Sequence, residues 1–437
     1  MAAARIYRHK WVLVKLPIAL VAVAVMAALW RSLMPLPPAE ITLSSGGPEG
    51  VYHAHARKYA ERFAEHGIQV RVVTSEGSVQ NLARLRQLAE PAADLAFVQG
   101  GSAAAQAPPE APPLITLARV DIEPVWIFSR VAGVENLQQL QGLRVSLGPR
   151  ASGTRELATQ LLQQVRLAPR DLQDSDLGGS AAVEALRKGE LDAVIMVSAP
   201  GSPLIRSLMQ MPGVQLVQLN RSAALIERMP HLQVRLIPAG LLDAQARLPA
   251  RDTAILATSA SLVARADLHP ALQRLAAHVA QQVHEPRGTL HRAGEFPTLR
   301  RVEFPASLEA RRTLAEGLPL LEARLPFWWA QVVERLLVIC LPVALLAYWL
   351  ARLVPAYLHW LVESRMVRWY GELKYIENDL ARNAMSPMEV ARNLGNLSDM
   401  ERRMQGFVVP GDLMPRWFML KQHIGFVRAG LLRRTGR

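Results

Sequence analysis

The sequence is poor in cysteine: only Cys340, one of 437 residues, is a cysteine, and it lies inside a hydrophobic run. A single cysteine forms no disulfide within the chain and cannot build a cysteine-based metal site, which excludes disulfide-stapled scaffolds and zinc ribbons. Cysteine usage does not decide the cellular compartment, because a domain without disulfides is compatible with the periplasm.

Motifs for nucleotides, metals and catalysis are also missing. Gly46–Gly50 forms neither a Walker loop nor a complete G-x-G-x-x-G, and no Lys-Ser/Thr pair follows it. His53 and His55 point to different faces of the expected helix, whereas a helical metal site needs i, i+4 spacing, and no acidic partner is placed by spacing for them or for His66. We therefore expect no enzyme, with no catalytic residue, metal or cofactor, and we expect these histidines on a solvated helix face.

Basic residues outnumber acidic ones, with a net charge of +13, but the excess is confined to the two ends of the chain. Residues 1–35 hold five Lys/Arg and no acid, residues 352–437 hold 14 basic and 8 acidic residues, and residues 36–326 hold 30 against 28. A nearly neutral centre gives nucleic acid nothing to bind, so we expect no nucleic-acid partner. Positive charge beside hydrophobic segments is instead typical of membrane proteins.

Two hydrophobic runs are the candidate membrane segments. Leu16–Trp30, extended by Trp11–Val14, reaches the roughly 20 residues that cross a bilayer. Leu336–Leu350 has tryptophan or tyrosine at both ends, as at membrane interfaces. A cleavable signal peptide is the alternative for the first run, and a buried core helix for the second. The basic flanks predict a two-pass protein of the cytoplasmic (inner) membrane, N-in and C-in, with residues 36–326 in the periplasm or another extracytoplasmic space.

The central region alternates short apolar strands with amphipathic helices. This alternation predicts βαβ units and mostly parallel sheets, and its restart near Glu123–Arg130 predicts a second sheet and therefore two lobes. The expected strands are Ile41–Leu43, Val70–Thr74, Asp94–Gln99, Arg144–Leu147 and Ala193–Val197, and the expected helices are Tyr52–Glu65, Val79–Leu88, Thr154–Val165 and Ala181–Lys188.

Three strand-to-helix junctions are rich in glycine and hydroxyl side chains: Ser44–Tyr52, Thr74–Asn81 and Leu147–Thr154. Ligands of α/β folds bind at the carboxyl ends of parallel strands, and helix N-termini attract anions through their unpaired N–H groups. The three junctions together favour a carboxylate-binding site. Ordinary capped loops are the alternative for each junction taken singly.

The same segments resemble a known family. Gly46–Tyr52, Thr74–Asn81, Asp94–Gln99, Gly148–Thr154 and Leu186–Val194 occur in this order and at matching spacing in the TAXI family of TRAP-transporter solute receptors, and the resemblance covers about residues 41–264. It implies the type II periplasmic-binding-protein fold, in which two α/β lobes joined by hinge strands close on a ligand. It also implies capture of a small organic anion or amino acid for a TRAP permease.

The resemblance implies a set of ligand-binding residues in both lobes. They are Gly46, Gly47, Gly50, Tyr52, Gly77, Ser78, Asn81, Gln99, Ser152, Gly153, Thr154 and Ser198. Tyr52 as a helix-packing residue and Asn81 as an aid to its own helix turn are the alternatives. The family's aromatic residue after a Pro-x-Gly turn is missing from Pro238–Leu242, so the ligand's identity stays open, and no arginine is identified as its guide.

The C-terminal tail adds a part that family receptors usually lack. Ser386–Glu389 predicts a helix start, and Met388, Leu394, Leu397, Met400 and Met404 should face Trp369, Leu373, Ile376 and Leu380 in a helical hairpin. Trp417–Arg434 is expected to lie on the inner membrane surface, and a solvated hairpin without a partner is the alternative. No phosphotransfer or cyclase signature is present.

These features predict an anchor in 1–35, lobe 1 in 36–125, lobe 2 in 126–249, a return to lobe 1 in 250–326, a membrane helix in 327–352 and a cytoplasmic helical tail in 353–437. The expected function is a tethered solute receptor for TRAP-type uptake, partnered by a TRAP permease or another membrane protein. A ligand sensor or scaffold that signals through the second membrane helix and the tail is the alternative.

Overall fold

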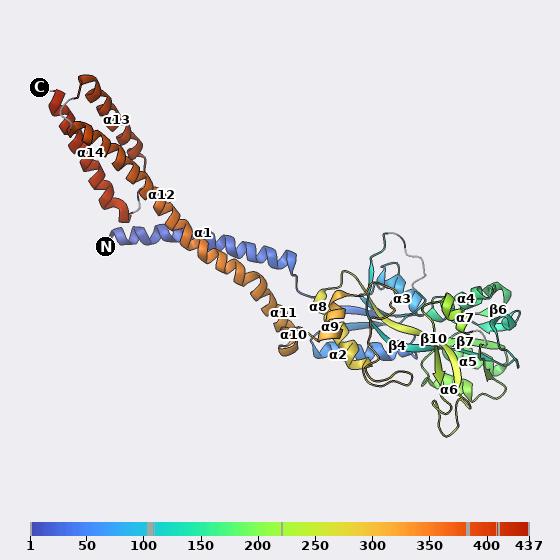
Figure 1. Cartoon of the computed structure of the whole chain (residues 1–437). Coiled ribbons are helices and arrows are strands. Elements are labelled where there is room, and N and C mark those ends of the chain that lie inside the picture. The colour runs from blue at the N-terminus through green and yellow to red at the C-terminus, as the bar shows by residue number, and fades with distance from the viewer. Residues whose placement is uncertain are drawn as a thin grey trace. The chain divides into compact units, whose positions relative to one another are not determined.

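The computed structural model describes residues 2–102, 108, 110–219, 222–381, 385–407, 409 and 411–435. The chain divides into two compact units (Figure 1). Leu36–Val333 forms one unit, and Met1–Pro35 together with Glu334–Arg437 forms the other. The boundaries that the sequence predicts inside these units stay a prediction.

The first lobe of the Leu36–Val333 unit is built on parallel strands. β1 (Glu40–Ser44) lies between β2 (Gln69–Val73) and β3 (Leu95–Gln99). Its helices are α2 (Val51–Glu65), α3 (Ser78–Leu85), α8 (Pro270–His284), α9 (Leu308–Glu316) and α10 (Leu320–Arg324). Tyr59 and Phe63 of α2 are fully buried with residues of α8 in one apolar core, so burial of these faces fixes both helices on the sheet.

The second lobe repeats the pattern on its own sheet. β5 (Arg144–Ser146) lies between β6 (Gln173–Ser175) and β7 (Ala193–Val197), all parallel. Its other elements are α4 (Gly153–Gln164), α5 (Gly179–Lys188), α6 (Pro203–Met209), α7 (Ser222–Arg228), β8 (Gln215–Leu216), β9 (Gln233–Ile237) and short 3-10 helices at Leu137–Leu140 and Pro169–Asp171. Separate apolar clusters lie on the two faces of this sheet.

Two long antiparallel strands join the lobes. β4 (Leu114–Ser129) and β10 (Thr253–Arg265) pair with each other, and β10 pairs with β3 of lobe 1 and with β9, while β4 pairs with β7 of lobe 2. Register shifts in their ladder fall between Ala260 and Ser261 and between Leu262 and Val263. Two α/β lobes joined by hinge strands confirm the fold class that the sequence predicts. β4 is not among the strands that the sequence predicts.

Both ends of this unit belong to lobe 1. β1 begins at Glu40, and four residues separate it from the Pro35 that ends the N-terminal segment. At the other end, α11 (Phe327–Arg335) inserts Phe327 into the lobe 1 core, and Trp328 Nε1 donates to the Gly67 carbonyl oxygen at 3.2 Å. The two apolar helices are therefore connected in sequence to the same lobe.

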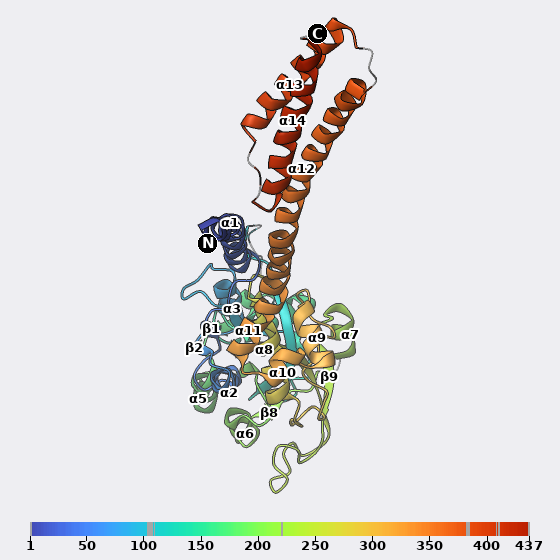
Figure 2. The same ribbon diagram turned by 90° about the vertical axis from the view of Figure 1, so that its left-hand side faces the viewer.

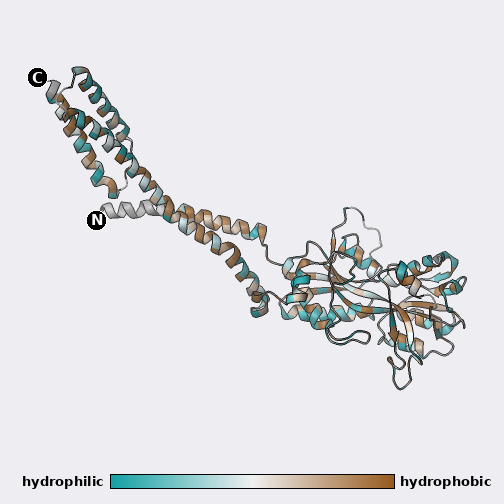
Figure 3. Cartoon of the chain, viewed as in Figure 1, coloured by the Kyte–Doolittle hydropathy of each residue, from teal (hydrophilic) through white to brown (hydrophobic). Residues whose placement is uncertain are grey.

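The second unit contains the two apolar helices. α1 (Ala2–Leu33) and α12 (Leu341–Ala381), which follows a π-helical turn at Leu336–Cys340, contain stretches long and apolar enough to cross a membrane, by length and composition (Figure 3). α1 and α12 contact each other. The buried Arg335 side chain donates from Nε to the Met34 carbonyl oxygen at 2.8 Å, and so ties the end of α1 to the start of the second apolar segment.

α12 continues beyond its apolar stretch into a three-helix bundle with α13 (Pro387–Gln405) and α14 (Met414–Thr435), preceded by a 3-10 turn at Gly411–Leu413 (Figure 2). The Ser386–Glu389 capping box begins α13, as the sequence predicts. Met388 is 84% exposed, so its expected place in the core is wrong. One face of α14 packs into the bundle, because Trp417, Leu420, Ile424, Val427 and Leu431 recur at helical spacing and are all buried in one cluster. Phe418, Met419 and Phe426 of the same helix are exposed, so its contact with the membrane surface stays a prediction.

Candidate functional site

The junction after β1 is held by main-chain bonds to the junction after β2. Ser45 N donates to the Val73 carbonyl oxygen at 2.9 Å, and Ser75 N donates to the Gly46 carbonyl oxygen at 3.2 Å. A Cβ on Gly50 would lie 3.0 Å from the Gly47 carbonyl oxygen, so the turn needs glycine there. A Cβ on Gly47 would meet nothing within 4 Å, which leaves this part of the loop open.

Asn81 connects β1 and β3 inside lobe 1. Its buried side chain donates from Nδ2 to the carbonyl oxygens of Ser45 at 2.6 Å and Phe97 at 2.8 Å, and its Oδ1 accepts from Ser44 Oγ at 2.6 Å. Both amide hydrogens are therefore used within the lobe. In this conformation Asn81 positions the junction loops.

The junction after β2 meets lobe 2 directly. Gln99 Nε2 donates to the Gly153 carbonyl oxygen at 3.0 Å, and a Cβ on Gly153 would lie 3.0 Å from Ser78 Oγ. Gly77 has φ +140°, which only glycine adopts easily, and its added Cβ would lie 3.0 Å from Ser152 Cα. The structure thus brings five of the predicted residues together across the lobes: Gly77, Ser78, Gln99, Ser152 and Gly153.

On the lobe 2 side, Ser152 caps α4. Its Oγ accepts from Arg155 N at 3.2 Å and donates to the Pro149 carbonyl oxygen at 2.7 Å. Arg155 binds the Asp174 carboxylate and the Gly148 carbonyl oxygen, and Arg150, 84% exposed, pairs with a nearby aspartate at 3.4 Å. Both arginines are thus engaged within lobe 2.

The two remaining lobe 2 residues of the predicted set are Thr154, which lies beside Gly148, and Ser198, which lies against the hinge strand. A Cβ on Gly148, which has φ +91°, would lie 3.3 Å from Thr154 Cβ. Ser198, after β7, is tied to the hinge by its main chain, because its carbonyl oxygen accepts from Trp126 Nε1 at 2.8 Å. Trp126 is fully buried, so the end of β7 is fixed against β4.

The hinge strand β4 supplies a residue that the sequence reasoning missed. Tyr52 Oη donates to Glu123 Oε2 at 2.7 Å, and the Tyr52 ring stacks on Phe97 at 5.6 Å. Burial raises the pKa of Glu123 to about 8, from an ordinary 4.5. Burial and the Glu123 charge raise the pKa of Tyr52, while the Ser78 hydroxyl, which also bonds to it, lowers it. The available signal was an acid within the apolar stretch 114–129.

Histidines pack beside this cluster without forming a reactive set. The expectation of a solvated face is wrong for His55, whose ring lies 4.7 Å from that of His284 and whose two ring nitrogens are buried, because α2 packs this face against α8. Burial lowers the pKa of His55 and lowers that of His284 to about 2, so both stay neutral. Within the described ranges, no group of three or more His, Cys, Asp or Glu residues is arranged to hold a metal ion.

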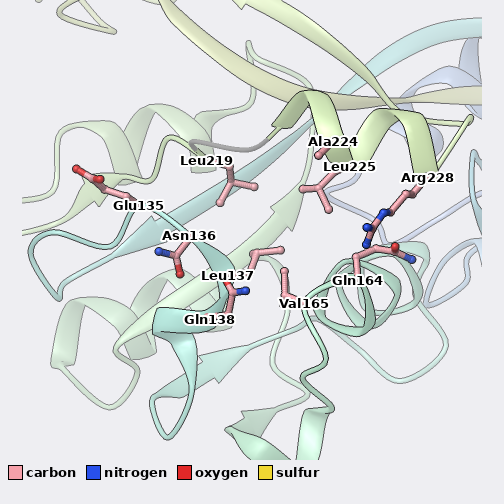
Figure 4. A pocket seen from close by; sticks show the side chains of 10 residues that line it. All are labelled: Glu135, Asn136, Leu137, Gln138, Gln164, Val165, Leu219, Ala224, Leu225 and Arg228. Carbon is pink, nitrogen blue, oxygen red and sulfur yellow. The ribbon is translucent and has the colours of Figure 1, made fainter.

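Well-formed surface hollows lie elsewhere, in lobe 2. One of about 170 Å³ has an apolar floor between Glu135 and Arg228 (Figure 4). Another, of about 430 Å³, lies beside α6. Neither is lined by a residue of the three junctions. The candidate site is therefore the meeting point of the junction loops and the hinge.

Comparison with known proteins identifies one family and a set of remote structural neighbours. A family model described as the NMT1-like family matches residues 44–276. A solved structure from Bordetella bronchiseptica RB50 is 16% identical, with a TM-score of 0.41, over 58% of this chain and 73% of that one. The alkanesulfonate-binding protein SsuA from Xanthomonas axonopodis pv. citri is 14% identical, with a TM-score of 0.34, over 64% and 85%. The aliphatic sulphonate-binding protein SsuA from Escherichia coli is also 14% identical, with a TM-score of 0.34, over 56% and 74%.

Proposed function

Because the chain belongs to the NMT1-like family, we propose that residues 36–326 form an extracytoplasmic receptor that binds a small carboxylate or amino-acid-like ligand between its lobes. We propose that it serves TRAP-type uptake, the role implied by the resemblance to TAXI receptors. The observation that carries the proposal is the bond from Gln99 Nε2 to the Gly153 carbonyl oxygen, 3.0 Å, because it joins across the lobes two residues that the sequence singles out for the ligand.

The proposed site keeps all the predicted residues but divides their roles. Asn81 and Ser152 act as positioning residues, because their polar side chains are already paired within their lobes. The others form the ligand-facing surface after the lobes separate: Gly46, Gly47, Gly50, Tyr52, Gly77, Ser78, Gln99, Gly153, Thr154 and Ser198. Main-chain N–H groups at the starts of helices are suitable donors to a carboxylate.

The proposed tether consists of the two apolar helices, with both chain ends in the cytoplasm and residues 36–326 outside. Their length and hydropathy, and the basic residues beside them, support this orientation. A reporter enzyme fused to the C-terminus, active only on one side of the membrane, tests it. Activity of that fusion in the periplasm would contradict the proposed topology.

Uptake is favoured over sensing by the way the lobes are connected. In a sensor that pulls on its membrane helices, a ligand must move one helix relative to the other. Here the N-terminal helix leads into β1 and the second follows α11, and both β1 and α11 belong to lobe 1. Closure of lobe 2 therefore changes a surface that a membrane partner such as a permease can read, with no need to displace either helix.

Binding is tested on the full-length protein in detergent by thermal shift. A ligand at 100 times its Kd stabilises the folded state by about 2.7 kcal/mol, which raises the midpoint by roughly 5–10 °C for a domain of this size. A panel of amino acids, mono- and dicarboxylates is the probe. If no compound of the panel raises the unfolding midpoint of protein that unfolds cooperatively, the receptor proposal is contradicted.

The sensor or scaffold alternative requires that the C-terminal tail bind a protein partner. The bundle of α12, α13 and α14 has its own buried core, which is suited to a protein partner. Truncation after Arg352 removes the bundle. Loss of a co-purifying protein in that variant, with ligand binding intact, would favour the alternative, whereas retention of the same partners would favour contact through the outer domain or the membrane helices.

A further inference from the structure

Glu123 is a buried acid without a cation. It is 8% exposed and lies on hinge strand β4, and Tyr52 Oη, at 2.7 Å, is its hydrogen-bond donor. Across the described ranges, no lysine, arginine or histidine lies within 4.0 Å of its carboxylate to form an ion pair. Asp121, two residues earlier on the same strand, is by contrast paired with His291 Nδ1 at 3.3 Å.

A buried carboxylate is costly unless a positive charge compensates it. A tyrosine hydroxyl donates one hydrogen bond but no charge. The groups facing Glu123 are this hydroxyl from α2, the Asp121 carboxylate of β4 itself and, through the Tyr52 hydroxyl, Ser78 of α3. Asp121 adds negative charge, so the surroundings of Glu123 are those of a site that favours an incoming cation.

The position of Glu123 connects it to the proposed ligand site. Tyr52 belongs to the junction after β1, and Ser78 belongs to the junction after β2 and lies 3.0 Å from the position of a Cβ on Gly153 of lobe 2. Glu123 thus lies behind the point where three junctions meet. The two arginines near this point, Arg150 and Arg155, are paired within lobe 2 and do not compensate it.

We propose that Glu123 receives the primary ammonium group of the ligand, so that the receptor selects amino acids over the corresponding simple carboxylic acids. This inference rests on the proposed receptor function and adds the charge pattern of the ligand to it. The ammonium group occupies the space beside the Tyr52 hydroxyl and pairs with the Glu123 carboxylate. No bond is made or broken other than loss of the Glu123 proton to solvent.

The test compares matched probes on the full-length protein in detergent. Each standard L-amino acid is paired with the acid that lacks its α-amino group, such as L-glutamate with glutarate, and dissociation constants are measured by calorimetry. We expect the amino acid that binds to do so at least tenfold more tightly than its deaminated partner. Glu123→Gln should remove this preference, while Glu61→Gln, on an exposed face of α2 and outside the proposed site, should retain it.

Proton release gives a second readout that needs no variant. Since the pKa of Glu123 is about 8 before binding, its carboxyl is mostly protonated at pH 7 and must lose nearly one proton when it pairs with an ammonium group. Calorimetry in two buffers of different ionisation enthalpy measures this number. Binding of an amino acid without proton release would overturn the proposal, even if Glu123→Gln fails to fold.

The outcomes separate the two proposals. Equal binding of amino acids and deaminated acids, or a preference that survives in Glu123→Gln, overturns the role of Glu123 and leaves the receptor function standing. If only deaminated acids bind, the role of Glu123 is likewise overturned and the receptor function stands. If no member of either class binds to folded protein, the proposed receptor function fails, and the role of Glu123 fails with it.

Discussion

Glu123 should make the outer domain less stable as the pH rises. Its pKa is about 8 in the folded protein and 4.5 in an unfolded chain, so the folded state binds the proton more tightly. The resulting stability is fully present below about pH 4.5 and is lost as the pH rises through 8. The loss amounts to about 1.4 kcal/mol per pH unit, or about 4 kcal/mol between pH 5 and 8.

Glu123→Gln isolates this effect, because glutamine keeps the shape and accepts the Tyr52 hydrogen bond but does not titrate. We expect the midpoint of thermal unfolding of the wild-type chain, relative to the variant, to fall by roughly 8–16 °C between pH 5 and 8. Glu61→Gln, on an exposed face of α2, is the matched control and should follow the wild type. If the unfolding midpoints of the wild type and Glu123→Gln differ by the same amount at every pH from 5 to 8, Glu123 does not have the raised pKa of a buried carboxyl without a cation.

Other substitutions test the remaining parts of the structure. Asn81→Ala should lower the stability of the outer domain by about 2–4 kcal/mol in chemical denaturation, because it removes one donor from each of two buried carbonyl oxygens. Unchanged stability with lost ligand binding would instead make Asn81 a ligand contact. Gly153→Ala should weaken ligand binding, because its added Cβ would crowd Gln99 and Ser78 of the other lobe. Gly395→Ala, where an added Cβ meets nothing within 4 Å, is the control and should bind the ligand as the wild type does. Equal ligand affinities of the Gly153→Ala variant and the wild type would contradict the contact between the lobes. Leu397→Ala should cost about 2–5 kcal/mol in bundle stability and accelerate proteolysis of the tail, while Met388→Ala, at an exposed position, should change little.

Local sequence signals predict the lobes well and the hinge poorly. The strand Ala193–Val197 is predicted with its exact bounds, because a short apolar run between a helix and a turn is typical of a buried strand. β4 is not among the predicted strands, because Asp121, Glu123 and Pro124 interrupt its apolar pattern. β10 (Thr253–Arg265) is rich in alanine and serine and has no clear alternation. Both strands are stabilised by pairing with each other, a long-range contact that no local pattern encodes.

The candidate site was predictable at the level of loops and not of side chains. The strand-to-helix pattern indicated the junctions and the resemblance implied that they meet, and Gln99 and Gly153 do meet across the lobes. Spacing could not indicate that Asn81 and Ser152 would satisfy their own polar groups within each lobe. Glu123 was missed because its partner Tyr52 lies 71 residues away, and only the folded hinge brings the two together.

The two acids of the hinge show how one strand can serve both binding and movement. Asp121 and Glu123 are neighbours on β4, yet Asp121 has His291 as its partner and Glu123 has only a neutral hydroxyl. The uncompensated acid gains charge complementarity only when a cation arrives. Since the same strand connects the lobes, a ligand that pairs with Glu123 stabilises the hinge conformation in which the pair forms, and recognition of the amino group is thereby coupled to closure.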